Sequence, residues 1–493
     1  MNERASDASL PNIPGYYHIE LFKSSSMMHV FFALFVLGVA LSVVWLVHLN
    51  SSSTPPIVVV ALNYQTRPSI IPSPNHVFQP VEAPSVWNGS FLSRNPHLWI
   101  YNLTVEDQHS LRAAVAHFQS SNKSLGKMTL NDFPLSKYLQ THIVEWKTQL
   151  SGLGRGFQVL RGVPVQNMTR AEIEIAFYGL GKHVGNPGAQ DVQGALLKQV
   201  IDVGPTNQTE RPYRTRAAIT YHCDGADIVA LLCLHPAKEG GASRIISTAS
   251  VYNQLLQHSN GQQYARRLFD KVLLFTDKSF ATSPYVSMGY LWYSLWRKVV
   301  PFRLDSAGVL RSYWNQELGF VRSYRDTKSG NATPAGIADR LALEATEAYE
   351  AILNKDVLDS RKETTENELG LSMHLQRGDI QLVSNHFVLH GRAAFTDYTP
   401  EEITAASATS SASHKTGAST QSSREHTQVT PRTFSNPTAA PNHNDLLAPI
   451  GQRELLRLWL THSDRDLTWS EYWTKQRARA ELLVTVLRDV FSY

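Results

Sequence analysis

The chain has 493 residues, of which 42% are hydrophobic and 18% are charged, and its formal net charge is +4. This length and composition are typical of a globular protein with one large or two ordinary domains. No basic run with interleaved aromatic residues is present, so nucleic acid is not an expected partner. The two cysteines, Cys223 and Cys233, are too few for a disulfide framework or a zinc cluster.

The first 85 residues divide by composition into three segments. Residues 1–26 form a polar tail, and residues 27–50 contain an apolar stretch from Val30 to Leu49 without a formal charge. As a helix this stretch would be about 30 Å long, which matches the hydrocarbon core of a bilayer. It exceeds the apolar part of a secretory signal, usually ~7–15 residues, and it lacks the striped pattern of a soluble core helix. We therefore expect a single transmembrane helix at 27–50, followed by a Pro- and Ser-rich linker at 51–85.

The charges around this helix bear on its orientation. Arg4 and Lys23 precede it and no Arg or Lys follows it until Arg67, which favours a cytosolic N-terminus and a lumenal body. Glycosylation sequons agree with that orientation; they begin at Asn88, Asn102, Asn122, Asn167, Asn207 and Asn331. The lack of a disulfide framework favours the opposite side. The sequence thus predicts a single-pass membrane protein and leaves the side of the membrane open.

Residues 86–493 form the predicted folded body. A glycine-bounded run predicts a strand between Gly154 and Gly162. Capping residues and apolar periodicity predict helices at 104–119, 135–150, 169–180, 250–270, 335–354 and 470–491. Residues 398–446 are rich in Ser, Thr, Ala, Pro and Asn, with few large apolar side chains. Such a segment cannot bury enough surface to offset its ordering entropy, so we expect a disordered insertion there.

The pattern around His222 and Asp224 predicts a metal site. These residues come just before the apolar run 228–234, and on one strand their side chains would point to the same face. An imidazole and a carboxylate, joined by a second histidine from a distant element, form the facial triad of non-haem Fe(II) oxygenases. A surface or core pair is the alternative interpretation. The same spacing recurs at His443 and His462, but His443 lies in the polar stretch and no histidine follows His462.

Two downstream histidines are candidates for the third ligand. His386 and His390 are four residues apart, which on a helix would form the two-histidine face of a zinc hydrolase. The turn expected at 378–379 and the alternating apolar residues after it predict a strand instead, and no Glu adjoins either histidine to act as a base. On a strand both would share a face, so the residues alone leave both open. Asn385 and Trp459 could line a substrate pocket, but we expect ordinary packing of both.

Five short motifs occur in an order that resembles one enzyme family. They are His222-x-Asp224, Gly240-Gly241-Ala242-Ser243, Gly378-Asp379-Ile380-Gln381, Leu389-His390-Gly391-Arg392 and Arg453-Glu-Leu-Leu-Arg457-Leu-Trp-Leu460. From about Val86 to Asp464 the chain resembles the TauD/TfdA-like (taurine dioxygenase, clavaminate synthase-like) Fe(II)/2-oxoglutarate-dependent oxygenases. The resemblance implies a mainly β fold with flanking helices, a double-stranded β-helix or jelly roll. It also implies that His390 joins His222 and Asp224 as the third iron ligand.

The resemblance further implies how the co-substrate is held. Arg453 would form a salt bridge to the distal carboxylate of 2-oxoglutarate, and Ser243 would add a hydroxyl where the family usually has Thr. Arg457 would steady the co-substrate at its metal end. One departure is the 63-residue interval (453 − 390) between His390 and Arg453, which the insertion at 398–446 explains. The membrane helix is a second departure, because it lies outside the family pattern.

These features predict an Fe(II)- and 2-oxoglutarate-dependent dioxygenase. The family's reaction uses dioxygen to convert 2-oxoglutarate to succinate and carbon dioxide and couples this to oxidation of a C–H bond. The expected substrate is a small organic molecule of specialised metabolism. The alternative is a membrane-tethered jelly-roll binding protein with a non-catalytic metal site, against which the intact ligand set and the two arginines count. The sequence does not indicate an oligomeric state.

Overall fold

The structure is a computed structural model, and it describes residues 72, 76–190, 195–204, 214–270, 272–275, 296–305, 307–315, 340–357, 368–405 and 451–461. The chain divides into two compact units, Met1–Thr66 and Arg67–Tyr493, and every described residue belongs to the second. The predicted polar tail, transmembrane helix and helix at 470–491 lie outside the described residues, as do His443 and His462. Within the described ranges, no helix is both long and apolar enough to cross a bilayer.

The larger sheet has the strand order β1-β2-β14-β6-β17-β3, with β4 also pairing with β17. All of these pairs are antiparallel except β1 with β2. The strands are β1 Ile100–Asn102, β2 Phe157–Arg161, β3 Asn186–Gly188, β4 Leu197–Ile201, β6 Ile228–His235, β14 Ile380–Ser384 and β17 Glu454–Thr461.

The smaller sheet has the strand order β13-β8-β15-β5 and is antiparallel throughout. Its strands are β5 Ile219–His222, β8 Ser243–Ser247, β13 Leu371–Met373 and β15 Val388–Arg392. Three short two-stranded ribbons accompany the two sheets. They pair β7 Glu239–Gly240 with β16 Phe395–Thr396, β9 Val272–Phe275 with β10 Trp296–Val299, and β11 Phe302–Leu304 with β12 Leu310–Ser312.

The pairing of eight strands follows a single rule. In chain order they are β4, β5, β6, β8, β13, β14, β15 and β17. The first pairs with the eighth, the second with the seventh, the third with the sixth and the fourth with the fifth. A chain folded back on itself in this way forms two facing antiparallel sheets, which is a jelly roll. The expectation of a mainly β fold with flanking helices is confirmed.

Side chains alternate between the two faces of the larger sheet, as strand geometry requires. Leu456, Leu458 and Leu460 of β17 belong to one hydrophobic cluster with three helices, α3 Val105–Ser120, α4 Lys137–Leu150 and α5 Arg170–Val184. The residues between these leucines point the other way, toward the smaller sheet. The interior between the sheets therefore receives Arg457 and Trp459.

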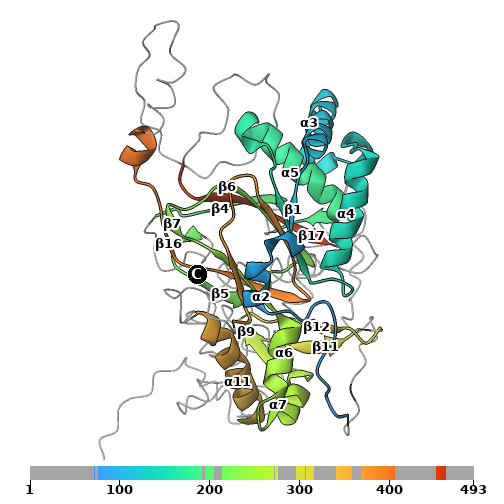
Figure 1. Cartoon of the computed structure of the whole chain (residues 1–493), viewed down its shortest axis with the longest axis vertical. Helices are drawn as coiled ribbons and strands as arrows, with labels where there is room; N and C mark the ends of the chain where they lie inside the picture. Colours follow the sequence, from blue (N-terminus) through green and yellow to red (C-terminus); the bar gives the residue numbers. More distant parts are fainter. Residues whose placement is uncertain are drawn as a thin grey trace, which may run out of the picture. The chain divides into compact units, whose positions relative to one another are not determined.

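A second group of helices packs on the smaller sheet. It comprises α6 Thr248–Leu256, α7 Gly261–Leu268 and α11 Arg340–Val357. Ile246 and Leu389 of the smaller sheet lie in their cluster. The two helical groups thus lie on opposite sides of the jelly roll (Figure 1). Because helices shield both outer faces, the space between the sheets is well removed from solvent.

The helix starts follow local capping chemistry. Thr104 and Asp107 form a capping box at α3, and Thr169 and Glu172 form one at α5, so three donors are satisfied within each box. Two helix predictions differ in detail. The helix expected at 250–270 is interrupted at 257–260, giving α6 and α7, and α5 extends beyond Leu180 to include His183.

The folded body begins earlier than predicted. Residues 76–85 were assigned to the linker, but Phe78 is 3% exposed and stacks on Phe269 with ring centroids 5.0 Å apart. Its backbone N–H and C=O are also hydrogen-bonded by the side chain of Gln262 in α7. Residue Trp87 is then followed by the short helix α2 Gly89–Arg94. At the other boundary, residues 400–405 of the predicted insertion are helical, while 406–450 lie outside the described residues.

Two predicted strands are each broken by a turn. The run from Tyr221 to Leu234 is not one strand, because β5 ends at His222 and β6 starts at Ile228. The run after Gly378 is likewise split, because β14 and β15 belong to different sheets and are joined by residues 385–387. In both places the chain crosses between the facing sheets, which an alternation pattern alone does not reveal.

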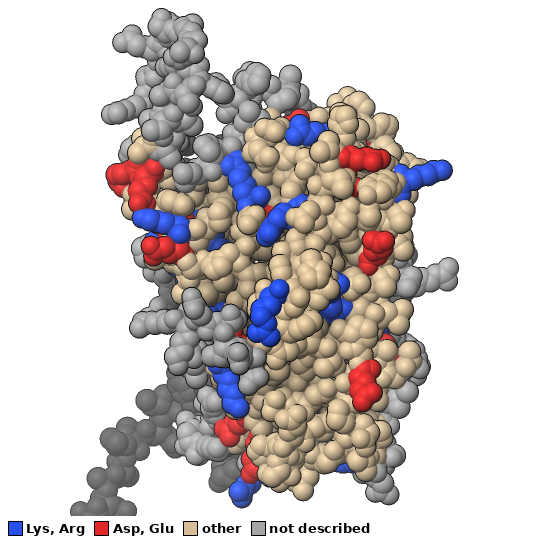
Figure 2. Space-filling model, in the orientation of Figure 1, with Lys and Arg blue, Asp and Glu red and all other residues tan. Residues whose placement is uncertain are grey.

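On the face of the molecule drawn in Figure 2, Lys and Arg side chains are interspersed with Asp and Glu side chains and separated by uncharged surface. The charges that matter most for a bound anion are instead the buried arginines described below.

Candidate metal centre

His222 and His390 are cross-strand neighbours on the inner face of the smaller sheet. They are register partners in the β5–β15 pair, and their ring centroids are 4.3 Å apart. Nδ1 of His222 lies 2.8 Å from the carbonyl oxygen of Thr220. Because a carbonyl only accepts, this nitrogen carries the ring proton, and Nε2 is left with a lone pair for a metal.

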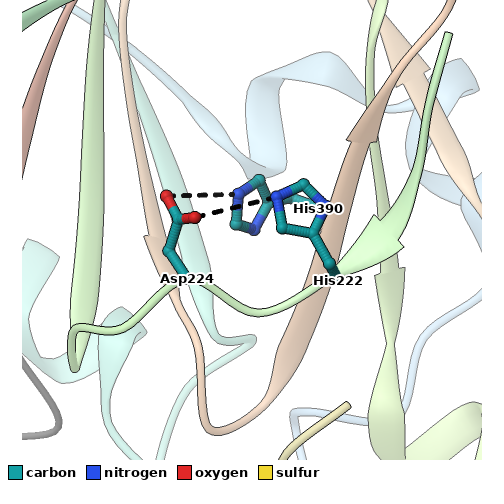
Figure 3. Close-up of side chains that lie close together, drawn as sticks. All are labelled: His222, Asp224 and His390. Atoms are coloured by element: carbon teal, nitrogen blue, oxygen red, sulfur yellow. Dashed lines mark ion pairs between the residues drawn. The ribbon is translucent and has the colours of Figure 1, made fainter. Parts of the chain in front are cut away.

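Asp224 completes the group from the loop that follows β5, rather than from the strand itself. Its Oδ1 lies 3.8 Å from Nε2 of His222, and its Oδ2 lies 3.8 Å from Nε2 of His390. The three side chains point toward one another from two strands and a loop (Figure 3). One ligand atom from each lies within 4.8 Å of the others, a spacing that suits one shared cation.

The charge states suit a divalent metal. Burial by itself would raise the pKa of Asp224, but Arg457, His390 and His222 together with the Trp459 hydrogen bond hold it well below its usual value. Burial, aided by His222, lowers the pKa of His390 to about 3. The group therefore presents one carboxylate and, at His390, a neutral imidazole, which is the protonation state that metal ligation requires.

The loop bearing Asp224 is held by the turn between β14 and β15. The side chain of Asn385 accepts from the backbone N–H of Asp224 at 3.2 Å and donates to the carbonyl of Ala226 at 2.6 Å. The backbone carbonyl oxygen of Asn385 accepts a hydrogen bond from the Cys223 thiol at 3.1 Å. Asn385 is thus a buried structural residue, as expected, and its amide fixes the position of the Asp224 backbone.

His386 lies away from the group. Its Nε2 is 2.8 Å from Oδ1 of Asp227, and both side chains are buried. Residue 386 sits in the turn between β14 and β15, not on a strand with His390, so the two rings do not share a face. Of the two histidines that the sequence left open, the structure brings His390 to His222 and Asp224.

Arg453 lies just before β17 and is 6% exposed. Its guanidinium carbon lies 4.9 Å from the ring centroid of Phe395, and its Nη1 has no hydrogen-bond partner among the described residues. Arg392, two residues beyond His390, stacks on the same ring at 4.8 Å, and its buried Nε likewise lacks a described partner. Burial lowers the pKa of Arg453 to about 10, so it is protonated at neutral pH. A buried cation with an unused donor is suited to a carboxylate ligand.

Ser243 lies beside this pair of arginines, because it is the register partner of Arg392 in the β8–β15 pair. It is buried, and its hydroxyl donates to Oε1 of Gln381 across the interior at 2.8 Å. The Ser243 hydroxyl oxygen retains its acceptor capacity, and it can rotate to donate elsewhere.

Arg457 lies at the metal end of the interior. Its Nη1 donates to Oδ2 of Asp224 at 3.1 Å, and its Nε donates to Oε1 of Gln190 at 2.8 Å. Trp459 also donates to Oδ2 of Asp224, from its indole Nε1 at 3.0 Å. Sequence reasoning missed Gln190 and expected ordinary packing of Trp459. The available signal was the two-residue spacing of Arg457 and Trp459, which places both on the inner face of β17.

A jelly roll with two histidines and one carboxylate converging on its inner face is the architecture of a non-haem iron oxygenase. Residues 118–279 match the profile described as "Taurine catabolism dioxygenase TauD, TfdA family". FR-33289 synthase of Streptomyces rubellomurinus is 27% identical over 328 residues, which is 65% of this chain and 85% of that protein. Taurine hydroxylase-like protein SAT17 of Stachybotrys chartarum is 25% identical over 303 residues, 59% of this chain and 69% of that protein.

Similar solved structures include asparagine oxygenase in complex with Fe(II), 2S,3S-3-hydroxyasparagine and succinate. It is 14% identical with a TM-score of 0.45, covering 74% of this chain and 93% of that one. Another is the non-heme iron oxygenase OrfP in complex with Fe and alpha-ketoglutaric acid, 14% identical with a TM-score of 0.45, covering 74% and 94%.

The chain thus carries a TauD/TfdA family domain at residues 118–279 and is similar to enzymes of that kind. It is therefore an oxidoreductase that uses Fe(II), 2-oxoglutarate and dioxygen to oxidise a small organic substrate. A binding protein with a non-catalytic metal site is not favoured.

Proposed function

We propose that His222, Asp224 and His390 hold the Fe(II) of this dioxygenase and that the reaction is hydroxylation of a small organic molecule. The observation that carries the proposal is the convergence of three ligand atoms within 4.8 Å, in the same interior as a buried guanidinium with an unused donor. Three protein ligands on one face of an octahedral ion leave positions for a chelating 2-oxo acid and for dioxygen. Iron so held supplies the oxidising chemistry, and the protein orients the reactants and excludes water.

The distal carboxylate of 2-oxoglutarate would bind Arg453. The unused Nη1 of Arg453 supplies a charge-assisted hydrogen bond, and Phe395 fixes the plane of the guanidinium by stacking. Ser243 would add its hydroxyl to the same carboxylate after turning from Gln381. Arg457 is a proposed contributor at the metal end, where its guanidinium already adjoins Asp224. A carboxylate held in this dry interior fixes the distance between the oxo-acid group and the metal.

The substrate class and the membrane attachment are further parts of this proposal. A place in specialised metabolism is supported by the similarity to FR-33289 synthase and to a taurine hydroxylase-like protein. We also propose that residues 27–50 tether the enzyme to a membrane by a single pass, supported by their uncharged apolar sequence. Continued sedimentation with membranes by a chain that lacks residues 1–66 would contradict the tether.

Oxygen-dependent decarboxylation of labelled 2-oxoglutarate by the full-length chain, reconstituted with Fe(II), tests the activity. We expect His222→Ala to abolish succinate formation. Arg453→Gln should raise the KM for 2-oxoglutarate by about 10- to 100-fold, as expected for loss of a hydrogen bond to a charged group. The exposed Arg340 provides the matched control, and Arg340→Gln should leave both parameters unchanged. Succinate formation retained by His222→Ala would refute the proposed iron site.

A second comparison separates the enzyme from a binding protein. Stoichiometric metal binding by the wild-type chain without measurable 2-oxoglutarate binding would favour the binding protein. If Arg453→Gln lowered metal affinity as much as co-substrate affinity, its assigned role would be wrong.

A further inference from the structure

The two oxygens of the Asp224 carboxylate differ in the hydrogen bonds that they accept. Arg457 and Trp459 both donate to Oδ2, at 3.1 Å and 3.0 Å. Among the hydrogen bonds that the structure shows to this carboxylate, none goes to Oδ1. Oδ1 instead faces Nε2 of His222 at 3.8 Å. Both oxygens also lie near an imidazole, because Oδ2 is 3.8 Å from Nε2 of His390, but only Oδ2 receives the two donors from β17.

Arg457 is itself held in place from two directions. Gln190 accepts from its Nε at 2.8 Å, and the same amide donates to the carbonyl oxygens of Arg457 and Leu196 at 2.8 Å and 2.9 Å. The guanidinium carbon also lies 5.0 Å from the ring centroid of Trp459. Gln190 and Arg457 are 3% and 8% exposed, so water competes little for these bonds.

Trp459 and Arg457 reach Asp224 from the same strand. It follows Arg457 by two residues on β17, so both side chains project from the same face of the strand toward the smaller sheet. The register of β17 is fixed on both sides by β6 and by β3 with β4. The two donors are therefore carried by a strand that cannot shift without breaking its hydrogen bonds to β6, β3 and β4.

We propose that Arg457 and Trp459 are positioning residues that hold Oδ2 of Asp224 and so fix the orientation of this carboxylate at the metal. This inference rests on the proposed function and adds to it the two side chains of β17 that would hold a metal ligand in place. Gln190 acts one step further out by fixing Arg457. Hydrogen-bond partners of metal ligands commonly change metal affinity by about 10- to 100-fold when removed.

Metal affinity of the full-length chain tests the proposal without relying on turnover. Mn(II) is titrated anaerobically into the metal-free chain, and the free ion is followed by electron paramagnetic resonance. We expect Trp459→Phe, which removes the indole N–H and keeps a ring, to weaken Mn(II) binding by about 10-fold. At saturating Mn(II), its affinity for 2-oxoglutarate should stay within about threefold of wild type, since Trp459 acts on the metal ligand.

Trp99→Phe is the matched control. Trp99 is also buried, and its indole Nε1 donates to the carbonyl of Leu92 at 2.8 Å, far from any proposed ligand. Its Mn(II) affinity should equal that of wild type. Gln190→Leu is a second variant that touches no metal ligand, and it should weaken Mn(II) binding by several-fold through Arg457.

The outcomes separate the inference from the function on which it rests. Wild-type affinity for Mn(II) in both Trp459→Phe and Gln190→Leu would overturn the positioning role while leaving the metal site intact. Reduced affinity for 2-oxoglutarate with unchanged Mn(II) affinity would overturn it as well, because it would place Trp459 against the co-substrate. A wild-type chain that binds no Mn(II) would instead remove the proposed metal site itself.

Discussion

Outside the metal centre, the partly exposed Arg161 forms an ion pair with the buried Asp379. Nε and Nη2 of Arg161 donate to the two carboxylate oxygens of Asp379, at 3.0 Å and 2.8 Å, and the Asp379 side chain is fully buried. Oδ2 of Asp379 also accepts from the backbone N–H of Gln376 at 2.8 Å. The pair joins the end of β2 to the turn that leads into β14, so one carboxylate organises a cross-strand contact and a turn together.

Removing the charge of Asp379 should be costly. Asp379→Asn removes the charged acceptor of two Arg161 hydrogen bonds and of the Gln376 N–H at a fully buried position, and we expect a loss of about 2 kcal/mol in the free energy of unfolding. Urea titration followed by circular dichroism would measure it. The matched control is Glu344→Gln, which breaks the exposed i,i+4 pair with Arg340 and should cost less than about 0.5 kcal/mol. Equal losses in the two variants would contradict the assignment.

At the residue scale, the metal-binding pattern was visible in the sequence because two of its members are two residues apart. His222 and Asp224 were identified from local spacing, although Asp224 lies in a loop and not on the expected strand. The choice of His390 over His386 could not come from spacing, because it depends on a turn at 385–387 that sends the two rings to different places. Family resemblance supplied the choice that local pattern left open.

The turn before β14 shows how much a single backbone position constrains an element. Gly378 has a φ of +85°, and a Cβ added there would lie 2.3 Å from the carbonyl oxygen of Val163. Its own N–H and C=O are engaged by Cys233 and Val163. Neither the backbone conformation nor the available space permits a side chain.

Gly378→Ala should therefore destabilise the fold well beyond the usual price of a left-handed residue, about 1–2 kcal/mol. Gly308 offers the matched comparison, because its φ is +76° and an added Cβ there would meet nothing within 4 Å. We expect Gly308→Ala to cost only that backbone term and Gly378→Ala to exceed it by at least about 1 kcal/mol in chemical denaturation. Similar values for both would show that the turn relaxes without strain.

At the element scale, the helices were predicted better than the strands. Helices α3 and α5 carry their start signals within four residues, in the capping boxes of Thr104 and Thr169. Strand ends in a jelly roll depend on where the chain crosses from one sheet to the other. The apolar alternation continues across such a crossing, as it does around residues 385–387, so the sequence merged β14 with β15.

Two buried histidines should set part of the pH dependence of the whole molecule. Burial lowers the pKa of His386 to about 4, with Arg311 and Arg303 adding to the effect, and burial with Arg377 and Arg170 lowers that of His235 to about 4. In the unfolded chain a histidine has a pKa near 6.5, so between pH 6.5 and 4 the unfolded state binds protons that the folded state does not. Stability should therefore fall as the pH falls through this window.

Replacing one of these histidines should reduce that slope. For the metal-free chain, His235→Gln should flatten the dependence of unfolding free energy on pH by about 1 kcal/mol per pH unit between pH 4.5 and 6. The exposed His109 provides the control, and His109→Gln should leave the slope unchanged. Parallel curves for wild type and His235→Gln would contradict the expected proton linkage.

Strand β17 lies between β6 on one side and β3 with β4 on the other, although it comes last of the described strands. When residues up to 405 have emerged from the ribosome, His222, Asp224 and His390 can fold, but none of the residues of β17 has yet emerged. At that moment β6 lacks its partner on one side, β3 and β4 have no described strand to pair with, and Asp224 lacks both donors to Oδ2. Acquisition of the metal should consequently follow translation of residue 461, so nascent chains stalled before that point should remain free of metal even when the ion is abundant.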